Sequence, residues 1–251
     1  MTTGISLHAY DKDFKKEYIL LASDSQRSTQ LNNMILAKSY DAKKILYNEK
    51  SNFFISHSGR QLTNSMNNSI NTIINYDQLI YESNLSKGMI FDILDKFEEP
   101  FYSNHYHFAI NEKGKLSLNA RAIPENFCNP KIIEKNIFCS WIGTGGEFIQ
   151  EFILDEVLKS KKNENGFLEI PLKHSLDFFY SSLCNASKKD QYTGGNMQIG
   201  VLEKNNSSLI YDFAPLEIKE DFYTIENRNL ESLRKENINL SKSLDKILLG
   251  I

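Results

Sequence analysis

The chain has no long hydrophobic run, no extended basic run and no paired-cysteine motif, and each absence excludes a class of protein. No apolar stretch approaches the roughly 20 residues that a membrane-spanning helix needs. No run of lysine and arginine is longer than a pair and the formal net charge is −3, so the sequence offers no basic field for a phosphate backbone. We therefore expect neither a membrane nor a nucleic acid among its partners.

Cysteine is also rare, and Cys128, Cys139 and Cys184 show no C-x-x-C spacing. An odd number of cysteines in apolar surroundings favours buried thiols over a disulfide framework or a zinc site. The histidines of His105-Tyr106-His107 share one face of a predicted strand, but no third metal ligand is evident, so a structural role is expected for them. The sequence thus predicts neither a metal nor another cofactor.

The N-terminal region turns polar at Tyr10-Asp11-Lys12-Asp13, so it lacks the apolar core of a secretory signal, and a cytoplasmic protein is expected. No linker rich in proline, glycine or serine divides the chain. This predicts one large domain over residues 2–216 and a C-terminal extension over residues 217–251.

Hydrophobic periodicity changes several times along the large domain. Alternating or continuous apolar residues predict strands at 3–9, 17–24, 42–47, 53–57, 106–111, 115–120, 137–142, 196–203 and 208–213. Helical spacing predicts helices at 61–82, 86–97, 145–159 and 171–186. Because the helices come in pairs between runs of strands, the order favours an α+β sandwich of two antiparallel sheets, each covered outside by two helices.

The C-terminal extension has a pattern of its own. Asn237 stands at one heptad position, and the other positions carry Leu230, Leu233, Leu240, Leu244 and Ile247. This spacing predicts a helical tail, which either folds back on its own domain or contacts a neighbouring subunit.

The first residues of the chain can carry chemistry. Removal of Met1 would leave Thr2 with a hydroxyl nucleophile and a free α-amine on one residue. An α-amine has an ordinary pKa of roughly 7.7–8.0, so near pH 7 it is partly neutral and able to accept the hydroxyl proton. An ordinary protein can also begin with Met-Thr-Thr, so the rest of the chain decides whether this pair has a function.

Five segments resemble the β-type subunits of the proteasome and HslV group of N-terminal nucleophile hydrolases, and the resemblance runs from Thr2 to about Phe213. They are Thr2-Thr3-Gly4-Ile5-Ser6-Leu7, Leu20-Leu21-Ala22-Ser23-Asp24-Ser25-Gln26-Arg27, Ala42-Lys43-Lys44-Ile45, Ile142-Gly143-Thr144-Gly145-Gly146 and Lys189-Asp190-Gln191-Tyr192-Thr193-Gly194-Gly195. The last segment is the most specific of the five. By size alone the chain is closer to the larger bacterial proteasome-like subunits of the Anbu type than to HslV.

The resemblance implies a four-layer αββα sandwich and a role for each matching residue. Thr2 Oγ would attack a peptide carbonyl, and the Lys44 ammonium would lower the pKa of the Thr2 α-amine. Asp24 would hold Lys44 charged and in place, since an unpaired buried ammonium is costly. Lys44 is preferred to Lys43 because it directly precedes the apolar Ile45, as in the family motif.

The resemblance also implies that Thr144, Asp190 and Thr193 orient the amine and Thr2, although two of these positions are usually serine in the family. The oxyanion donor would be the backbone N–H of Gly59, because glycine lets the backbone approach a ligand closely. His57 lies near this position, and we expect it to pack or to line the substrate pocket rather than act as a base.

These features imply a threonine peptidase that acts on peptides or unfolded proteins inside a self-compartmentalising homo-oligomer, either a ring or a helical ring. They leave open whether an ATPase partner exists. One alternative is a catalytically silent ring subunit, against which the intact Thr2, Asp24 and Lys44 argue. A second is an N-terminal nucleophile amidase for a small-molecule amide, against which the Asp-x-Tyr-Thr-Gly-Gly segment argues.

Overall fold

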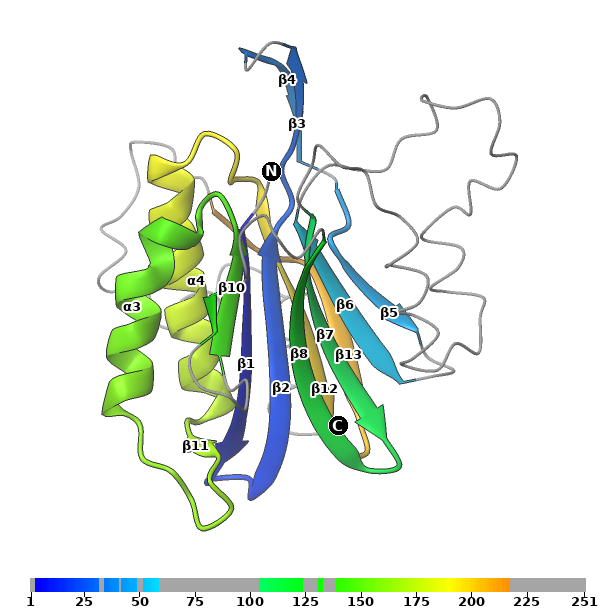
Figure 1. Cartoon of the computed structure of the whole chain (residues 1–251), viewed down its shortest axis with the longest axis vertical. Helices are drawn as coiled ribbons and strands as arrows, with labels where there is room; N and C mark the ends of the chain where they lie inside the picture. The colour runs from blue at the N-terminus through cyan, green and yellow to red at the C-terminus, as the bar shows by residue number, and fades with distance from the viewer. Residues whose placement is uncertain are drawn as a thin grey trace.

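The computed structural model describes residues 3–31, 34–40, 42–48, 52–58, 104–123, 131–132 and 139–216. Within these ranges the chain is a mixed α+β fold of mainly antiparallel strands with two helices, α3 (Gly146–Lys159) and α4 (Leu172–Lys189) (Figure 1). The α+β class predicted from the sequence is therefore confirmed. The predicted helices at 61–82 and 86–97 and the C-terminal extension at 217–251 lie outside the described residues.

The larger sheet has seven strands in the order β13-β12-β2-β1-β10-β9, with β11 paired to β1. The strands are β1 (Thr3–Asp11), β2 (Lys16–Asp24), β9 (Lys131–Ile132), β10 (Cys139–Gly143), β11 (Leu168–Glu169), β12 (Asn196–Glu203) and β13 (Ser207–Pro215). β1 runs antiparallel to both β2 and β10, so Thr3 lies opposite Gly143 and next to the end of β2. β12 begins at the same end, where Met197 lies opposite Asp24. Four strand ends therefore meet around Thr3.

The smaller sheet has four antiparallel strands in chain order, β5 (Ile45–Asn48), β6 (Phe53–Ser58), β7 (Asn104–Glu112) and β8 (Lys115–Ile123). A separate hairpin, β3 (Arg27–Leu31) and β4 (Met34–Ser39), extends away from the two sheets at the top of Figure 1. The sequence pattern predicts no strand at this hairpin.

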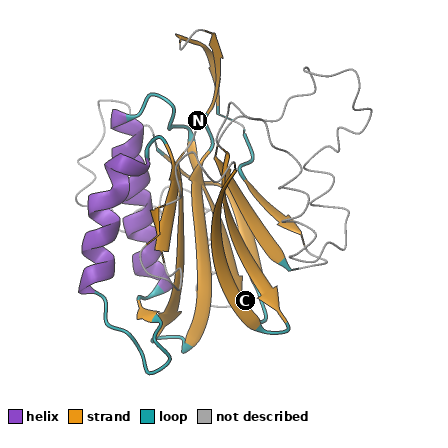
Figure 2. Ribbon diagram, viewed as in Figure 1, coloured by secondary structure: helices purple, strands orange, loops and turns teal. Residues whose placement is uncertain are grey.

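The two faces of the larger sheet are covered differently, by helices on one side and by the smaller sheet on the other (Figure 2). Successive strand residues point to opposite faces. Alternate residues of β2 therefore divide between two cores, with Leu20 packing in the helix-side core and Ile19 and Leu21 packing against Phe54 of the smaller sheet. This two-sided burial explains why β2 has a continuous apolar run.

The predicted elements within the described ranges are confirmed with small shifts at their ends. The largest shifts are of three residues: β8 and α4 end three residues later than predicted, and β5 begins at Ile45 instead of residue 42. Two of the preceding backbone N–H groups bond outside the smaller sheet, since Ala42 N donates to Ser25 O and Lys44 N donates to the side chain of Gln198. The two-residue strands β9 and β11 have no signal in the sequence pattern.

Two of the three cysteines, Cys139 and Cys184, are buried and form no disulfide, as predicted, and Cys128 lies outside the described residues. On α3, Ile149 and Ile153 are buried whereas Phe152 is exposed, so the apolar residues of this helix are only partly covered. Over the described ranges, none of the helices has the length and apolar character needed to cross a membrane.

Candidate active site

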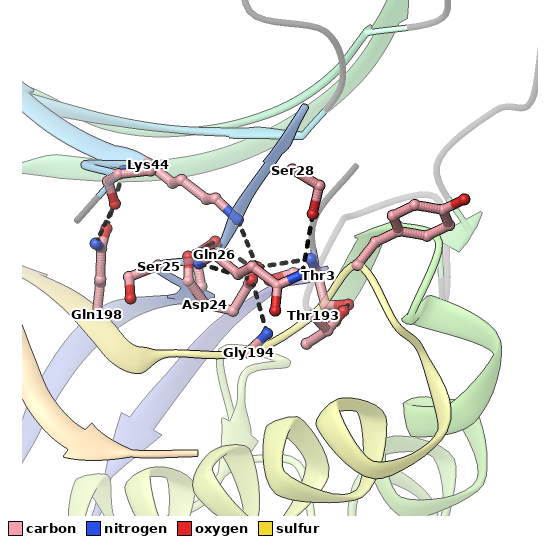
Figure 3. A network of polar contacts seen from close by, with 12 residues as sticks. Thr3, Asp24, Ser25, Gln26, Ser28, Lys44, Thr193, Gly194 and Gln198 are labelled. Carbon is pink, nitrogen blue, oxygen red and sulfur yellow. Dashed lines mark hydrogen bonds and ion pairs between the residues drawn. The ribbon is translucent and has the colours of Figure 1, made fainter. Parts of the chain in front are cut away.

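Asp24, the last residue of β2, is fully buried and joins four segments of the chain (Figure 3). Its Oδ1 accepts hydrogen bonds from the backbone N–H of Thr3 and from Lys44 Nζ, both at 2.9 Å. Its Oδ2 accepts from the backbone N–H groups of Gly194, at 3.1 Å, and Gln26, at 3.2 Å. A buried carboxylate is tolerated only when it is paired and hydrogen-bonded, and these contacts supply both.

Lys44 contributes the largely buried cation of this site. Its side chain is only 10% exposed and makes an ion pair with Asp24 at 2.9 Å. Lys43, by contrast, is exposed, and its ammonium lies over the ring of Tyr211 at 4.8 Å from the ring centroid. The structure therefore brings Lys44, the lysine preferred from the sequence, to Asp24.

Asp190 organises a second group, made of hydroxyls. Its Oδ2 accepts hydrogen bonds from Thr144 Oγ1 at 2.7 Å and from Thr193 Oγ1 at 2.8 Å. Thr193 Oγ1 lies 2.5 Å from Thr3 Oγ1. Because a hydroxyl has one proton and Thr193 gives its proton to Asp190, the hydroxyl of Thr3 donates to Thr193.

The two groups meet at Thr3, whose backbone N–H binds Asp24 and whose side chain binds Thr193. Thr3 is fully buried. The predicted nucleophile Thr2 lies outside the described residues, but it is bonded to Thr3, with adjacent Cα atoms about 3.8 Å apart. The predicted oxyanion donor Gly59 also lies outside them, directly after the last residue of β6. Of the five predicted site residues that the structure describes, two contact Thr3 directly, and Lys44, Asp190 and Thr144 are linked to it through those two.

Gly145 allows this convergence, because it comes directly against Thr3. A Cβ atom placed on Gly145 would lie 1.9 Å from Thr3 Oγ1 and 2.9 Å from Thr193 Oγ1. Real Cβ atoms do not approach other atoms so closely, so no larger residue fits here without displacing the hydroxyl pair. Gly145 is also the N-cap residue directly before α3, so the start of the helix lies beside the hydroxyl group.

Sequence reasoning missed three polar residues that hold the site together. Thr3 is not among the predicted site residues, yet it links the two groups. Gln198 is buried, accepts from Lys44 N at 2.9 Å and donates to Ala42 O at 2.5 Å, which fixes the approach of Lys44. Gln26 is fully buried beside Asp24. Of these three residues only Gln198 has a signal in the sequence, because it is a polar residue inside the apolar run of β12.

His107 belongs to a separate polar cluster between the sheets. Its Nε2 lies 2.7 Å from Ser140 Oγ, which lies 2.9 Å from Ser6 Oγ. Complete burial, together with the neighbouring His105, lowers the pKa of His107 to about 3, so its imidazole is neutral at physiological pH. These contacts agree with the structural role expected for this histidine.

Among the residues that the structure describes, no group of three or more His, Cys, Asp or Glu side chains is placed to hold a metal ion. The ring of His57 packs near that of Tyr106, with centroids 5.1 Å apart, as the packing role predicts.

Comparison of the chain with models of known protein families gave no match, and neither did comparison with curated protein sequences. The spacing of its motifs and the geometry around Thr3 are therefore the basis on which its function is inferred.

Proposed function

We propose that the protein is a threonine peptidase of the N-terminal nucleophile type, with Thr2 as nucleophile once Met1 is removed. The observation that carries this proposal is that Asp24 and Thr193 both bind Thr3, the residue next to Thr2, while Lys44 binds the same oxygen of Asp24. These residues come from separate segments and include a buried ion pair. A purely structural strand end has no need of a buried lysine.

Lys44 and Asp24 would prepare the α-amine of Thr2 to act as a base. The Lys44 ammonium is a fixed positive charge bound to the same carboxylate oxygen as the backbone N–H of Thr3. A nearby positive charge disfavours a second one, so it lowers the pKa of the α-amine. The neutral amine can then accept a proton near pH 7.

The reaction divides into two half-reactions. Thr2 Oγ attacks the peptide carbonyl and gives its proton to the α-amine, directly or through a water molecule. The backbone N–H of Gly59 would donate to the oxyanion, and loss of such a donor typically raises the barrier by about 3 kcal/mol. The α-ammonium then returns its proton to the leaving amine, and water hydrolyses the resulting ester of Thr2.

Thr3 would hold this N-terminal residue in position. Its backbone N–H is bound to Asp24, and its hydroxyl is bound to Thr193 and through it to Asp190. With the N–H and the side chain both fixed, the start of β1 has little freedom to rotate. Positioning of this kind lowers the entropy cost of bringing a nucleophile to its substrate.

We also propose a four-layer architecture for the large domain. The described layers are two helices, the larger sheet and the smaller sheet. The two helices predicted within residues 59–103 would cover the outer face of the smaller sheet, which gives the four-layer αββα sandwich of N-terminal nucleophile hydrolases. We further propose a cytoplasmic homo-oligomer, a ring or helical ring, that encloses the site and acts on peptides or unfolded proteins.

Substitution of Thr2 by alanine tests the proposal. The purified wild type should lack Met1 by intact mass and should cleave fluorogenic peptides, whereas Thr2→Ala should be inactive with an unchanged melting temperature. Thr3→Ala should retain reduced activity, because it loses the contact with Thr193 but not the nucleophile. Peptide cleavage by freshly purified Thr2→Ala would overturn the proposal, and an inactive wild type without Met1 would favour a silent ring subunit.

A further inference from the structure

Gln26 lies two residues after Asp24 and is 0% exposed. Its side-chain Nε2 donates hydrogen bonds to the backbone oxygen of Gln191 at 2.8 Å and to Ser28 Oγ at 3.0 Å. Its backbone N–H donates to the backbone oxygen of Gly194 at 3.0 Å as well as to Asp24. One residue therefore makes contacts with both its main chain and its side chain at the candidate site (Figure 3).

The two carbonyl groups that Gln26 binds lie on either side of Thr193. We call residues Asp190–Gly195 the site loop, which carries Gln191, Thr193 and Gly194. Holding two carbonyl groups three residues apart fixes the loop between them, and the Thr193 hydroxyl then points at Thr3. The bond to Gly194 uses a backbone N–H, whereas the bond to Gln191 needs a side-chain donor of this length.

The other polar atom of the Gln26 side chain, Oε1, shows that the position does not favour an amide unless its Nε2 donor is needed. Gln26 Oε1 is buried and finds no hydrogen-bond partner among the residues described. An unpartnered buried carbonyl is unfavourable, so an apolar side chain of equal volume would otherwise suit this position better. The contact from Nε2 to the site loop accounts for a glutamine here.

We propose that Gln26 is a positioning residue of the active site, which acts through the site loop. By fixing Gln191 and Gly194 it holds Thr193 against Thr3 and so places the start of β1, which carries Thr2. This inference rests on the function proposed above. It adds Gln26 to the site residues that the sequence motifs predicted.

Substitution of Gln26 by methionine removes the donor while it keeps the length and volume of the side chain. In the full-length protein we expect kcat to fall roughly 10- to 100-fold with KM nearly unchanged, because the nucleophile is displaced and the substrate pocket is not. Hydrogen exchange of the amides in the site loop should become faster. Gln26→Asn, whose amide is one methylene shorter, should change both readouts in the same direction.

Two variants serve as matched controls. Gln191→Ala removes an exposed side chain but keeps the backbone oxygen that Gln26 binds. Ser28→Ala removes the other acceptor of Nε2 and leaves the bond to Gln191. Both should keep wild-type kcat and wild-type exchange in the site loop.

Wild-type kcat in a folded Gln26→Met protein, or unchanged exchange of its site loop, would overturn the inference. If this variant does not fold, Gln26→Asn decides by the same two criteria. Failure of the proposed function looks different, since the wild type itself would then be inactive after loss of Met1. In that case exchange alone decides, and faster exchange in the site loop of Gln26→Met supports only that Gln26 fixes this loop.

Discussion

Lys44 Nζ and the backbone N–H of Thr3 share one acceptor, Oδ1 of Asp24, each at 2.9 Å. The side chains of Asp24 and Lys44 are 0% and 10% exposed. A single carboxylate oxygen therefore connects a buried cation to the strand that begins beside Thr2.

Lys44→Met should abolish peptide cleavage and should also destabilise the fold. The substitution leaves the Asp24 carboxylate buried without its cation, and breaking a buried ion pair in this way typically costs about 3–5 kcal/mol. Lys43→Met is the control, because Lys43 is exposed and contacts the ring of Tyr211. Fluorogenic peptide assays and chemical denaturation measure both effects, and activity that depends on Lys43 instead of Lys44 would contradict the assignment.

Gly145→Ala should strongly reduce activity. The added Cβ would lie 1.9 Å from Thr3 Oγ1, so either Thr3 or the start of α3 must move. Glu147→Ala, which changes an exposed residue in the first turn of the same helix, should keep wild-type activity. Equal kcat for the two variants would mean that the packing of Gly145 on Thr3 does not matter for catalysis.

His107 should make the fold less stable in acid. Burial lowers its pKa to about 3 in the folded protein, compared with about 6.5 in the unfolded chain. Between these pH values the unfolded chain binds more protons, so this residue's contribution to stability falls as the pH falls, by up to about 1.4 kcal/mol per pH unit.

Denaturant unfolding of the wild type and of His107→Gln, at intervals from pH 7 to pH 4, measures this effect. The variant should lose less stability over that range than the wild type does. His174→Gln controls for loss of an exposed imidazole and should follow the wild type. If wild type and His107→Gln show the same slope, His107 does not stay neutral in the folded state.

We predict that the protein assembles into an oligomer, and exposed apolar residues on α3 give a structural reason. Phe152 and Leu158 on this helix are 43% and 80% exposed, and burial at a subunit contact would remove their apolar surface from water. We expect light scattering to report a particle far above the 28.9 kDa of one chain. A protein that is strictly monomeric at micromolar concentration would contradict the proposed ring or helical ring.

Truncation from Leu230 onward should change the size or homogeneity of that particle without unfolding the domain. The heptad spacing of the C-terminal extension is the basis for this expectation. The same light-scattering measurement, paired with a thermal melt, separates the two effects. A truncated protein with an unchanged particle would assign the extension to packing on its own subunit.

The strands that pattern alone predicted are those with strong periodicity or long apolar runs, such as β1 and β2, and the same holds for α4. The hairpin of β3 and β4 was missed because Arg27–Leu31 is mostly polar and shows no alternation. β9 and β11 are two residues each, which is too short for any periodic signal. Local patterns therefore predict long elements, and pairing with distant strands creates the short ones.

The candidate site likewise contains residues that the sequence predicted and residues that only the fold revealed. The resemblance predicted Asp24, Lys44 and Asp190 as site residues, because each stands in a short segment whose neighbouring residues match a family motif. Gln198 was missed because its role depends on contact with Lys44, which lies 154 residues away in the chain. No periodicity encodes a tertiary contact of this kind, so buried polar residues such as Gln198 were assigned only from the fold.

Treatment with a peptide epoxyketone, followed by mass spectrometry of the N-terminal peptide, tests the central claim most directly. This inhibitor class needs a hydroxyl and a free α-amine on the same residue, and the claim is that Thr2 supplies both. We predict a chain that lacks Met1 and carries the adduct on Thr2, and a Thr2→Ala protein that remains unmodified. A wild-type chain that has lost Met1 but leaves Thr2 unmodified would contradict the account.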